Sequence, residues 1–103
     1  MELAEACYRL TKRFPTSEQY GLTVQMRRAA VSVASNVAEG HRRTRPGYVH
    51  HLQIALGSLA ELETQVELAQ RLEFVSAEEA ASFIGALERS GQLLHGLLRS
   101  LRS

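Results

Sequence analysis

The sequence contains no Trp and no Asp, and only one Cys, two Pro and one Lys among its 103 residues. A single Cys excludes a disulfide framework within the chain, and the missing Asp removes a common ligand of magnesium and calcium sites. No run approaches the ~20 apolar residues that a membrane-spanning helix needs. Ala, Leu, Glu and Arg dominate instead, and all four favour helices. The composition therefore predicts one all-α domain over residues 1–103.

Apolar residues recur at helical spacing in four segments, which predicts four helices. The expected helices run over Glu2–Phe14, Ser17–Glu39, Pro46–Leu72 and Ala77–Leu101. Pro15 ends the first of them, Gly40 is expected to cap the second, and Ser76 with Glu79 forms a capping box before the fourth. Because the connections are short, the helices are expected to form an antiparallel up-down four-helix bundle.

The third segment carries the longest uninterrupted apolar stripe. Its members alternate spacings of four and three, and they are Tyr48, Leu52, Ala55, Leu59, Leu62, Val66 and Ala69. Other apolar residues of the second and third segments lie outside the stripe that a single bundle buries, so a monomer would leave them partly exposed. We therefore expect a homo-oligomer whose interface contains Val31, Ala38, Val49, Leu56 and Leu68.

Charge is distributed unevenly along the chain, although the net charge is only +1. Eight basic residues face two Glu over residues 9–51, a balance of +6, whereas residues 52–103 hold four Arg and seven Glu. Such asymmetry is typical of a basic surface that meets a polyanion; the alternative is a set of solvated charges. The candidate nucleic-acid-binding residues are Arg42, Arg43, Arg45, Arg27, Arg28, Arg9, Lys12 and Arg13.

The two Arg of the second helix differ from the others because they lie in mid-helix between apolar residues. One of Arg27 and Arg28 is expected to face a partner surface or to pair with a Glu. No cluster of aromatic residues is apparent for stacking bases, so binding is expected to use phosphate contacts and to show little sequence preference.

Catalytic and metal-binding motifs are absent from the sequence. No Glu-x-x-His pair of the kind that builds di-iron sites in helical bundles occurs, and adjacent His50 and His51 point about 100° apart on a helix. Cys7 lies among apolar neighbours and is expected to be a small core residue. We therefore expect a non-enzymatic protein with no catalytic residues, no metal and no cofactor. The acidic, amphipathic start differs from a signal peptide, which predicts a cytoplasmic location without membrane contact.

Two stretches resemble the signature of a bacterial family, the four helix bundle proteins, also called ribosomal RNA intervening-sequence proteins. They are GLTVQMRRAAVSVASNVAEG at 21–40 and LQIALGSLAELETQVELA at 52–69, with Phe14-Pro15 and Tyr20-Gly21 before them. The matching positions, read mainly as architectural, are Gln25, Arg28, Asn36, Glu39, Gly40, Gly57, Glu61 and Glu63. The chain departs from the family pattern in its short first helix, at Ala34, where Pro is common, and at Pro46-Gly47.

The resemblance implies a four-helix bundle that assembles as a ring-like homopentamer. Family members are encoded within intervening sequences of large-subunit ribosomal RNA genes, and relatives in diversity-generating retroelements bind nucleic acid and a reverse transcriptase. No catalytic residues are implied. The leading expectation is therefore an oligomeric module whose partners are itself, RNA or DNA, and a reverse transcriptase or other protein. The alternative is a purely protein-binding or structural assembly without nucleic acid.

Overall fold

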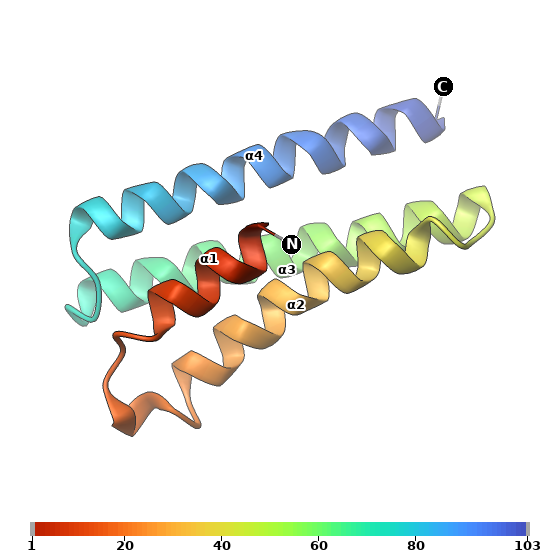
Figure 1. The fold of residues 1–103 in the computed structure, drawn as a ribbon. Helices are drawn as coiled ribbons and strands as arrows, with labels where there is room; N and C mark the ends of the chain where they lie inside the picture. Colours follow the sequence, from red (N-terminus) through yellow and green to blue (C-terminus); the bar gives the residue numbers. More distant parts are fainter. Residues whose placement is uncertain (1, 103) are drawn as a thin grey trace.

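The structure is a computed structural model that describes residues 2–102, and this part of the chain holds four α-helices and no strand (Figure 1). The helices are α1 (Glu2–Thr11), α2 (Leu22–Gly40), α3 (Arg45–Arg71) and α4 (Ala77–Arg102), and a short 3-10 helix, η1 (Thr16–Glu18), precedes α2. The all-α fold with four helices is thus confirmed. The molecule is elongated, with extents of 44 × 24 × 18 Å, because α3 and α4 are 27 and 26 residues long.

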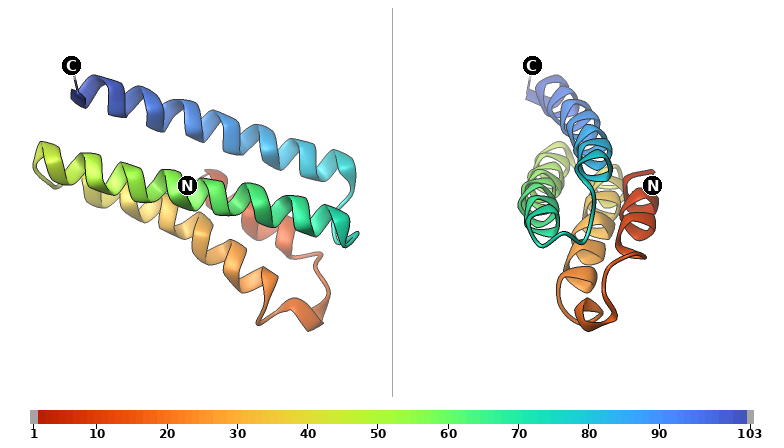
Figure 2. Two further views of the ribbon diagram at one scale, coloured as in Figure 1. Left: turned by 180° about the vertical axis from the view of Figure 1, so that it is seen from behind. Right: turned by 90° about the vertical axis from the view of Figure 1, so that its left-hand side faces the viewer.

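The four helices pack mainly on their neighbours in sequence. α2 packs most extensively on α3, α3 packs on α4, and α1 lies against both α2 and α4. Because α1 has only 10 residues, it covers only part of the bundle: it begins near the middle and ends toward the α3–α4 connection, so the C-terminal half of α4 has no α1 beside it (Figures 1 and 2). One continuous apolar core nevertheless joins all four helices.

The predicted stripe of α3 is the best confirmed part of the core. Six of its seven members are buried, and Tyr48 at the start is half-buried. The largest fully buried side chains of the molecule are Met26, Leu52, Leu62, Leu87, Leu94, Val66 and Cys7. Each fully buried Leu or Met contributes roughly 1.5–3 kcal/mol relative to an exposed one. Cys7 is a core residue, as expected, and its burial raises the pKa of the thiol to about 11.

The first helix is shorter than predicted, because it ends at Thr11 and not at Phe14. Thr11 is buried although it is polar, and its hydroxyl donates a hydrogen bond of 2.8 Å to the carbonyl of Cys7. A Pro at position 15 also disfavours helical geometry at Phe14. The chain turns here, and the Phe14 ring packs on Phe74 of the α3–α4 connection with centroids 5.5 Å apart.

The predicted capping box at the start of α4 is confirmed. The Ser76 hydroxyl accepts a hydrogen bond from the Glu79 backbone N–H at 3.0 Å, and the Glu79 carboxylate accepts one from the Ser76 N–H at 2.9 Å. This backbone hydrogen bond is the main reason that the pKa of Glu79 is lowered, and the nearby Arg13 guanidinium adds to the effect. The capping box therefore determines where α4 begins, and it favours the charged form of the Glu79 carboxylate.

The expected glycine cap of α2 is wrong, because the helix includes Gly40 and its C-cap is His41 in ordinary helical geometry. Among residues 2–102, no glycine has a positive φ. A left-handed residue instead ends α3, where Glu73 has φ 63° and the Phe74 N–H donates to the Ala69 carbonyl at 2.9 Å. This is a Schellman motif with Glu at the position where Gly is usual. Gly40 instead allows the Tyr48 ring to pack closely on the end of α2.

Candidate nucleic-acid interface

The connection between α2 and α3 carries three of the predicted binding residues, Arg42, Arg43 and Arg45, and all three are exposed. Arg43 forms an ion pair with Glu39, with 2.6 Å between its Nη2 and the carboxylate. Within residues 2–102, Arg42 and Arg45 have no ion-pair partner. Two guanidinium groups of the loop are therefore available to an external anion without breaking an existing contact.

Gly40 and Gly47 hold the loop in a tight path. A Cβ on Gly40 would come within 2.8 Å of Tyr48 Cδ1, and one on Gly47 would come within 2.8 Å of Arg43 Cβ. Tyr48 thus lies directly on the end of α2, where its ring also packs on His41 with centroids 4.8 Å apart. The loop is consequently shaped by close packing, although its Arg side chains are exposed.

A polar network links α2 to α3. The Asn36 amide nitrogen donates to the Ser32 carbonyl at 2.9 Å, and its oxygen lies 2.8 Å from Nδ1 of His51. The Ser58 hydroxyl donates to the Ser32 hydroxyl at 3.0 Å. Asn36, which the family resemblance marks as an architectural position, makes these polar contacts within the chain. The network fixes the relative position of the two helices that carry the loop.

Two further Arg residues lie at this end of the molecule, and the sequence pattern did not single them out. Arg99 and Arg102 belong to the last turns of α4, which lie at the same end as the α2–α3 loop in both views (Figures 1 and 2). We call Arg42, Arg43, Arg45, Arg99 and Arg102 the basic end. All five lie within residues 40–60 or 89–102, two stretches that contain no acidic residue.

The Glu residues of the C-terminal half lie elsewhere. All seven fall between residues 61 and 88, in the stretch that covers the remainder of α3, the α3–α4 connection and the first half of α4. The fold therefore separates charge along its long axis, although the C-terminal half is acidic as a whole. Counting charges along the chain missed this, because α4 returns its last basic turns to the loop.

The other predicted basic residues are placed away from the basic end, near the junction of α1 and η1. Arg9 lies 3.9 Å from Glu5, and Arg13 makes an ion pair of 2.7 Å with Glu79 of α4. Exposed ion pairs of this kind contribute roughly 0–1 kcal/mol to stability. They therefore reduce the local positive charge without holding the side chains firmly in place. Lys12 is exposed and, in the described part of the chain, has no ion-pair partner.

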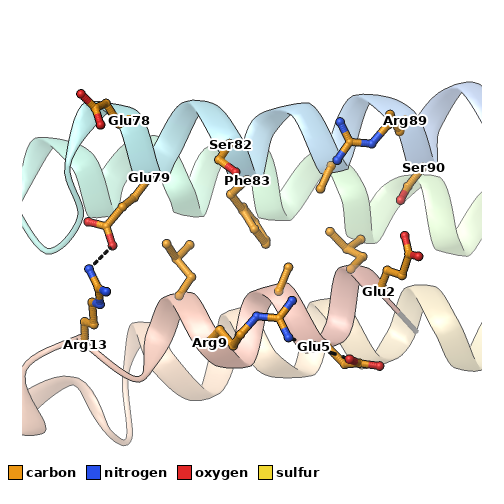
Figure 3. A pocket seen from close by; sticks show the side chains of 14 residues that line it. Glu2, Glu5, Arg9, Arg13, Glu78, Glu79, Ser82, Phe83, Arg89 and Ser90 are labelled. Carbon is orange, nitrogen blue, oxygen red and sulfur yellow. Dashed lines mark hydrogen bonds and ion pairs between the residues drawn. The ribbon is translucent and has the colours of Figure 1, made fainter.

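The groove between α1 and α4 has a volume of about 770 Å³ and mixes both charges (Figure 3). Arg9, Arg13 and Arg89 line it together with four Glu, namely Glu2, Glu5, Glu78 and Glu79. The four carboxylates of this lining repel a polyanion and so offset the attraction of its three Arg. We therefore exclude this groove from the candidate interface.

Arg27 and Arg28 differ from each other, and neither pairs with a Glu among residues 2–102, which corrects that part of the sequence expectation. Arg27 is half-buried: its Nε donates to the Thr11 hydroxyl at 2.9 Å, and its guanidinium carbon lies 4.5 Å from the centroid of the Tyr8 ring. Arg28 is exposed. Both line a shallow groove between α1 and α2 together with two Tyr.

The five predicted interface residues divide into two sets. Val31, Ala38 and Leu68 are exposed, whereas Val49 and Leu56 are partly buried and pack against the core of their own chain. Three further apolar residues outside the predicted interface set are exposed, and these are Ile54, Leu72 and Leu93. Ile54, Leu68 and Leu72 share α3 or its end with Gly57, around which there is open space.

Two kinds of site were not found. Residues 2–102 contain no group of three metal-ligating side chains, and none of the four helices has the length and apolar character that a membrane crossing requires.

The fold and the charge distribution together define a class: a small all-α protein of four helices with a cluster of Arg at one end. The chain belongs to the 23S rRNA-intervening sequence protein family, whose model matches residues 1–96. A crystal structure of a protein of unknown function from the S23 ribosomal protein family, from Bacteroides thetaiotaomicron VPI-5482, has the same fold, with a TM-score of 0.83. The two chains are 23% identical, over 94% of this chain and 92% of that one. No curated protein matches the chain.

Proposed function

We propose that the protein is a non-enzymatic, antiparallel up-down four-helix bundle that binds RNA or DNA through its basic end. The observation that supports this most directly is the separation of charge. Arg42, Arg43 and Arg45 share one end of the molecule with Arg99 and Arg102, and Glu39 is the acidic residue that directly precedes their loop. Guanidinium groups bind phosphate oxygens in a bidentate manner, so such an end fits a phosphate backbone.

The proposal includes assembly into a homo-oligomer, for which the family resemblance suggests five copies. Exposed Leu68, Leu72 and Leu93 support it, since their exposed fractions range from 46% to 64% on the single chain. Burial between copies would remove apolar area from water at roughly 25 cal/mol per Å². A ring would also repeat the basic end, so that weak phosphate contacts reinforce one another at high effective concentration.

The basic end is tested by salt dependence in a matched pair of variants. Replacing Arg42 and Arg45 by Ala removes two guanidinium groups that have no partner within the described chain, whereas replacing Arg71 and Arg89 by Ala removes the same charge elsewhere. If each loop Arg neutralises one phosphate, the log–log slope of affinity against salt becomes shallower by about 1.8 on duplex DNA and about 1.4 on a single strand. Fluorescence anisotropy over a salt series measures this slope.

The control variant should keep the parent slope, because its lost charges lie outside the basic end. Equal slopes for both variants and the parent would show that the loop is solvated surface only. A parent protein that binds neither RNA nor DNA at low salt would refute nucleic-acid binding and favour the protein-binding assembly.

Oligomerisation is tested by light scattering at micromolar concentration. The expected mass is several times the 11.4 kDa of one chain. Replacing exposed Leu68 by Glu is expected to lower that mass, because it places a charge in the apolar face of α3 without entering the core. A mass of one chain for the parent would refute the assembly.

A further inference from the structure

We infer that the groove between α1 and α2 binds unpaired nucleobases, so that the nucleic acid recognised by this protein is single-stranded. The groove has a volume of about 620 Å³, and it is lined by Tyr8, Gln19, Tyr20, Thr23, Val24, Arg27, Arg28, Val31 and Ser32. It lies on the face where α1 meets α2, away from the basic end. The inference rests on the proposed function in taking nucleic acid as the partner, and it adds which form is bound.

The first argument is the pair of aromatic rings, which the sequence pattern did not bring together. Tyr8 comes from α1 and Tyr20 from the turn before α2, and both line the same groove. Their exposed fractions are 46% and 87%, which is high for side chains of this size. Every base presents a flat π face, so exposed rings of this kind stack bases with little regard to sequence. The sequence shows no aromatic cluster, and these two rings line one groove only because the chain folds.

The second argument is the fixed position of Arg27. Its Nε is held by the Thr11 hydroxyl at 2.9 Å, which is itself held by the Cys7 carbonyl, and its planar group stacks on Tyr8. Both Nη atoms have no hydrogen-bond partner in the part of the chain that the structure describes. A guanidinium whose stem is fixed and whose donors are unused is preorganised for an anion.

The third argument is charge complementarity. Arg27 and Arg28 line the groove, and none of the lining residues is acidic. The groove between α1 and α4 differs in this respect, since four Glu line it. Two Val, two Tyr rings and two guanidinium groups match a strand whose bases and phosphates alternate. Gln19, which is exposed, adds an amide group that can meet base edges.

A duplex does not fit this arrangement, because its bases are stacked on one another and their faces are covered. The basic end requires phosphates only and accepts either form. The two regions therefore make separable contributions: the basic end provides salt-dependent affinity, and the groove provides preference for unpaired bases.

The experiment compares Tyr20→Leu with Tyr20→Phe, using a 20-residue oligothymidylate and an abasic 20-mer with the same number of phosphates. Tyr20 is 87% exposed, so neither substitution disturbs the core. Loss of one stacked base lowers affinity roughly 5-fold to 150-fold. Tyr20→Leu should show this loss on oligothymidylate, keep the parent affinity for the abasic strand and keep the parent salt slope. Tyr20→Phe retains the ring and should bind like the parent.

Three results would overturn the inference, and they differ from one another. If the parent binds the thymidine and abasic strands equally and Tyr20→Leu changes neither, the groove does not stack bases, although binding through the basic end stands. If the parent binds neither strand, the proposed function fails and the inference fails with it. If Tyr20→Leu lowers the oligomer mass and leaves affinity unchanged, a second copy of the chain occupies the groove.

Discussion

Replacing Leu62 by Ala is expected to lower the free energy of unfolding by about 3 kcal/mol, within the roughly 2–5 kcal/mol seen when a buried Leu is truncated. Leu62 lies in the middle of α3 and is fully buried. Its removal costs the transfer free energy of the lost methyl groups and leaves a cavity that two packed neighbours, α2 and α4, cannot close without moving. Urea denaturation followed by circular dichroism measures the change at a fixed protomer concentration.

Leu68 provides the matched control, since it is the same residue type on the same helix but is 46% exposed. Leu68→Ala should change the stability of the chain by no more than about 0.5 kcal/mol, as is usual for surface substitutions. Comparable losses for Leu62→Ala and Leu68→Ala would contradict the burial pattern of α3, unless the Leu68 loss disappears when the oligomer is dissociated. That dependence on protomer concentration would itself locate Leu68 at the contact between copies.

The burial pattern of α3 could be predicted from sequence because one physical cause determines it. A helix of 27 residues that contacts α2 on one side and α4 on the other must bury residues at spacings of three and four. Leu52, Leu62 and Val66 follow that rule without competition from polar groups. The capping box of Ser76 and Glu79 was predictable for a similar reason, since both hydrogen bonds are local.

The ends of α1 and α2 were less predictable, because tertiary contacts decide them. Thr11 has a polar side chain and was not assigned to the core, yet it is buried where its hydroxyl links the Cys7 carbonyl to Arg27 of another helix. Gly40 reads as a helix cap in sequence, but its role is to admit the Tyr48 ring at a distance that a Cβ would not allow. The decisive partners, Arg27 for Thr11 and Tyr48 for Gly40, lie on another helix, so a pattern within one helix does not reveal them.

The candidate site shows the same division. The Arg residues of the 42–45 loop were recognisable from local density of charge, whereas Arg99 and Arg102 join them only because α4 returns to that end. The groove could not be predicted at all, since Tyr8 of α1 and Tyr20 of the turn before α2 line it together only in the folded chain. A local density of charge can be read along the sequence, whereas a stacking surface depends on which helices the fold brings together.

Cys7 is expected to react with a thiol reagent such as DTNB far more slowly in the native protein than in the unfolded chain. It is fully buried, and desolvation raises the pKa of its thiol from 9.0 to about 11 against the opposing effect of Arg27. A shift of two pKa units lowers the thiolate fraction at pH 8 by about 100-fold, and the thiolate is the reacting species. Burial slows the reaction further, because the reagent reaches the sulfur only after the structure opens.

The labelling rate in Leu62→Ala reveals which opening exposes the thiol. If Cys7 reacts only after global unfolding, a loss of about 3 kcal/mol should raise its labelling rate about 100-fold, since 1.4 kcal/mol corresponds to a factor of ten. If the 10-residue α1 detaches alone, the rate should hardly change, because Leu62 lies on α3 and α1 packs on α2 and α4. Native Cys7 labelled as fast as the unfolded chain would contradict its burial. Detachment of α1 alone would also separate Tyr8 from Arg27, so this measurement determines whether the groove between α1 and α2 is as stable as the bundle that carries it.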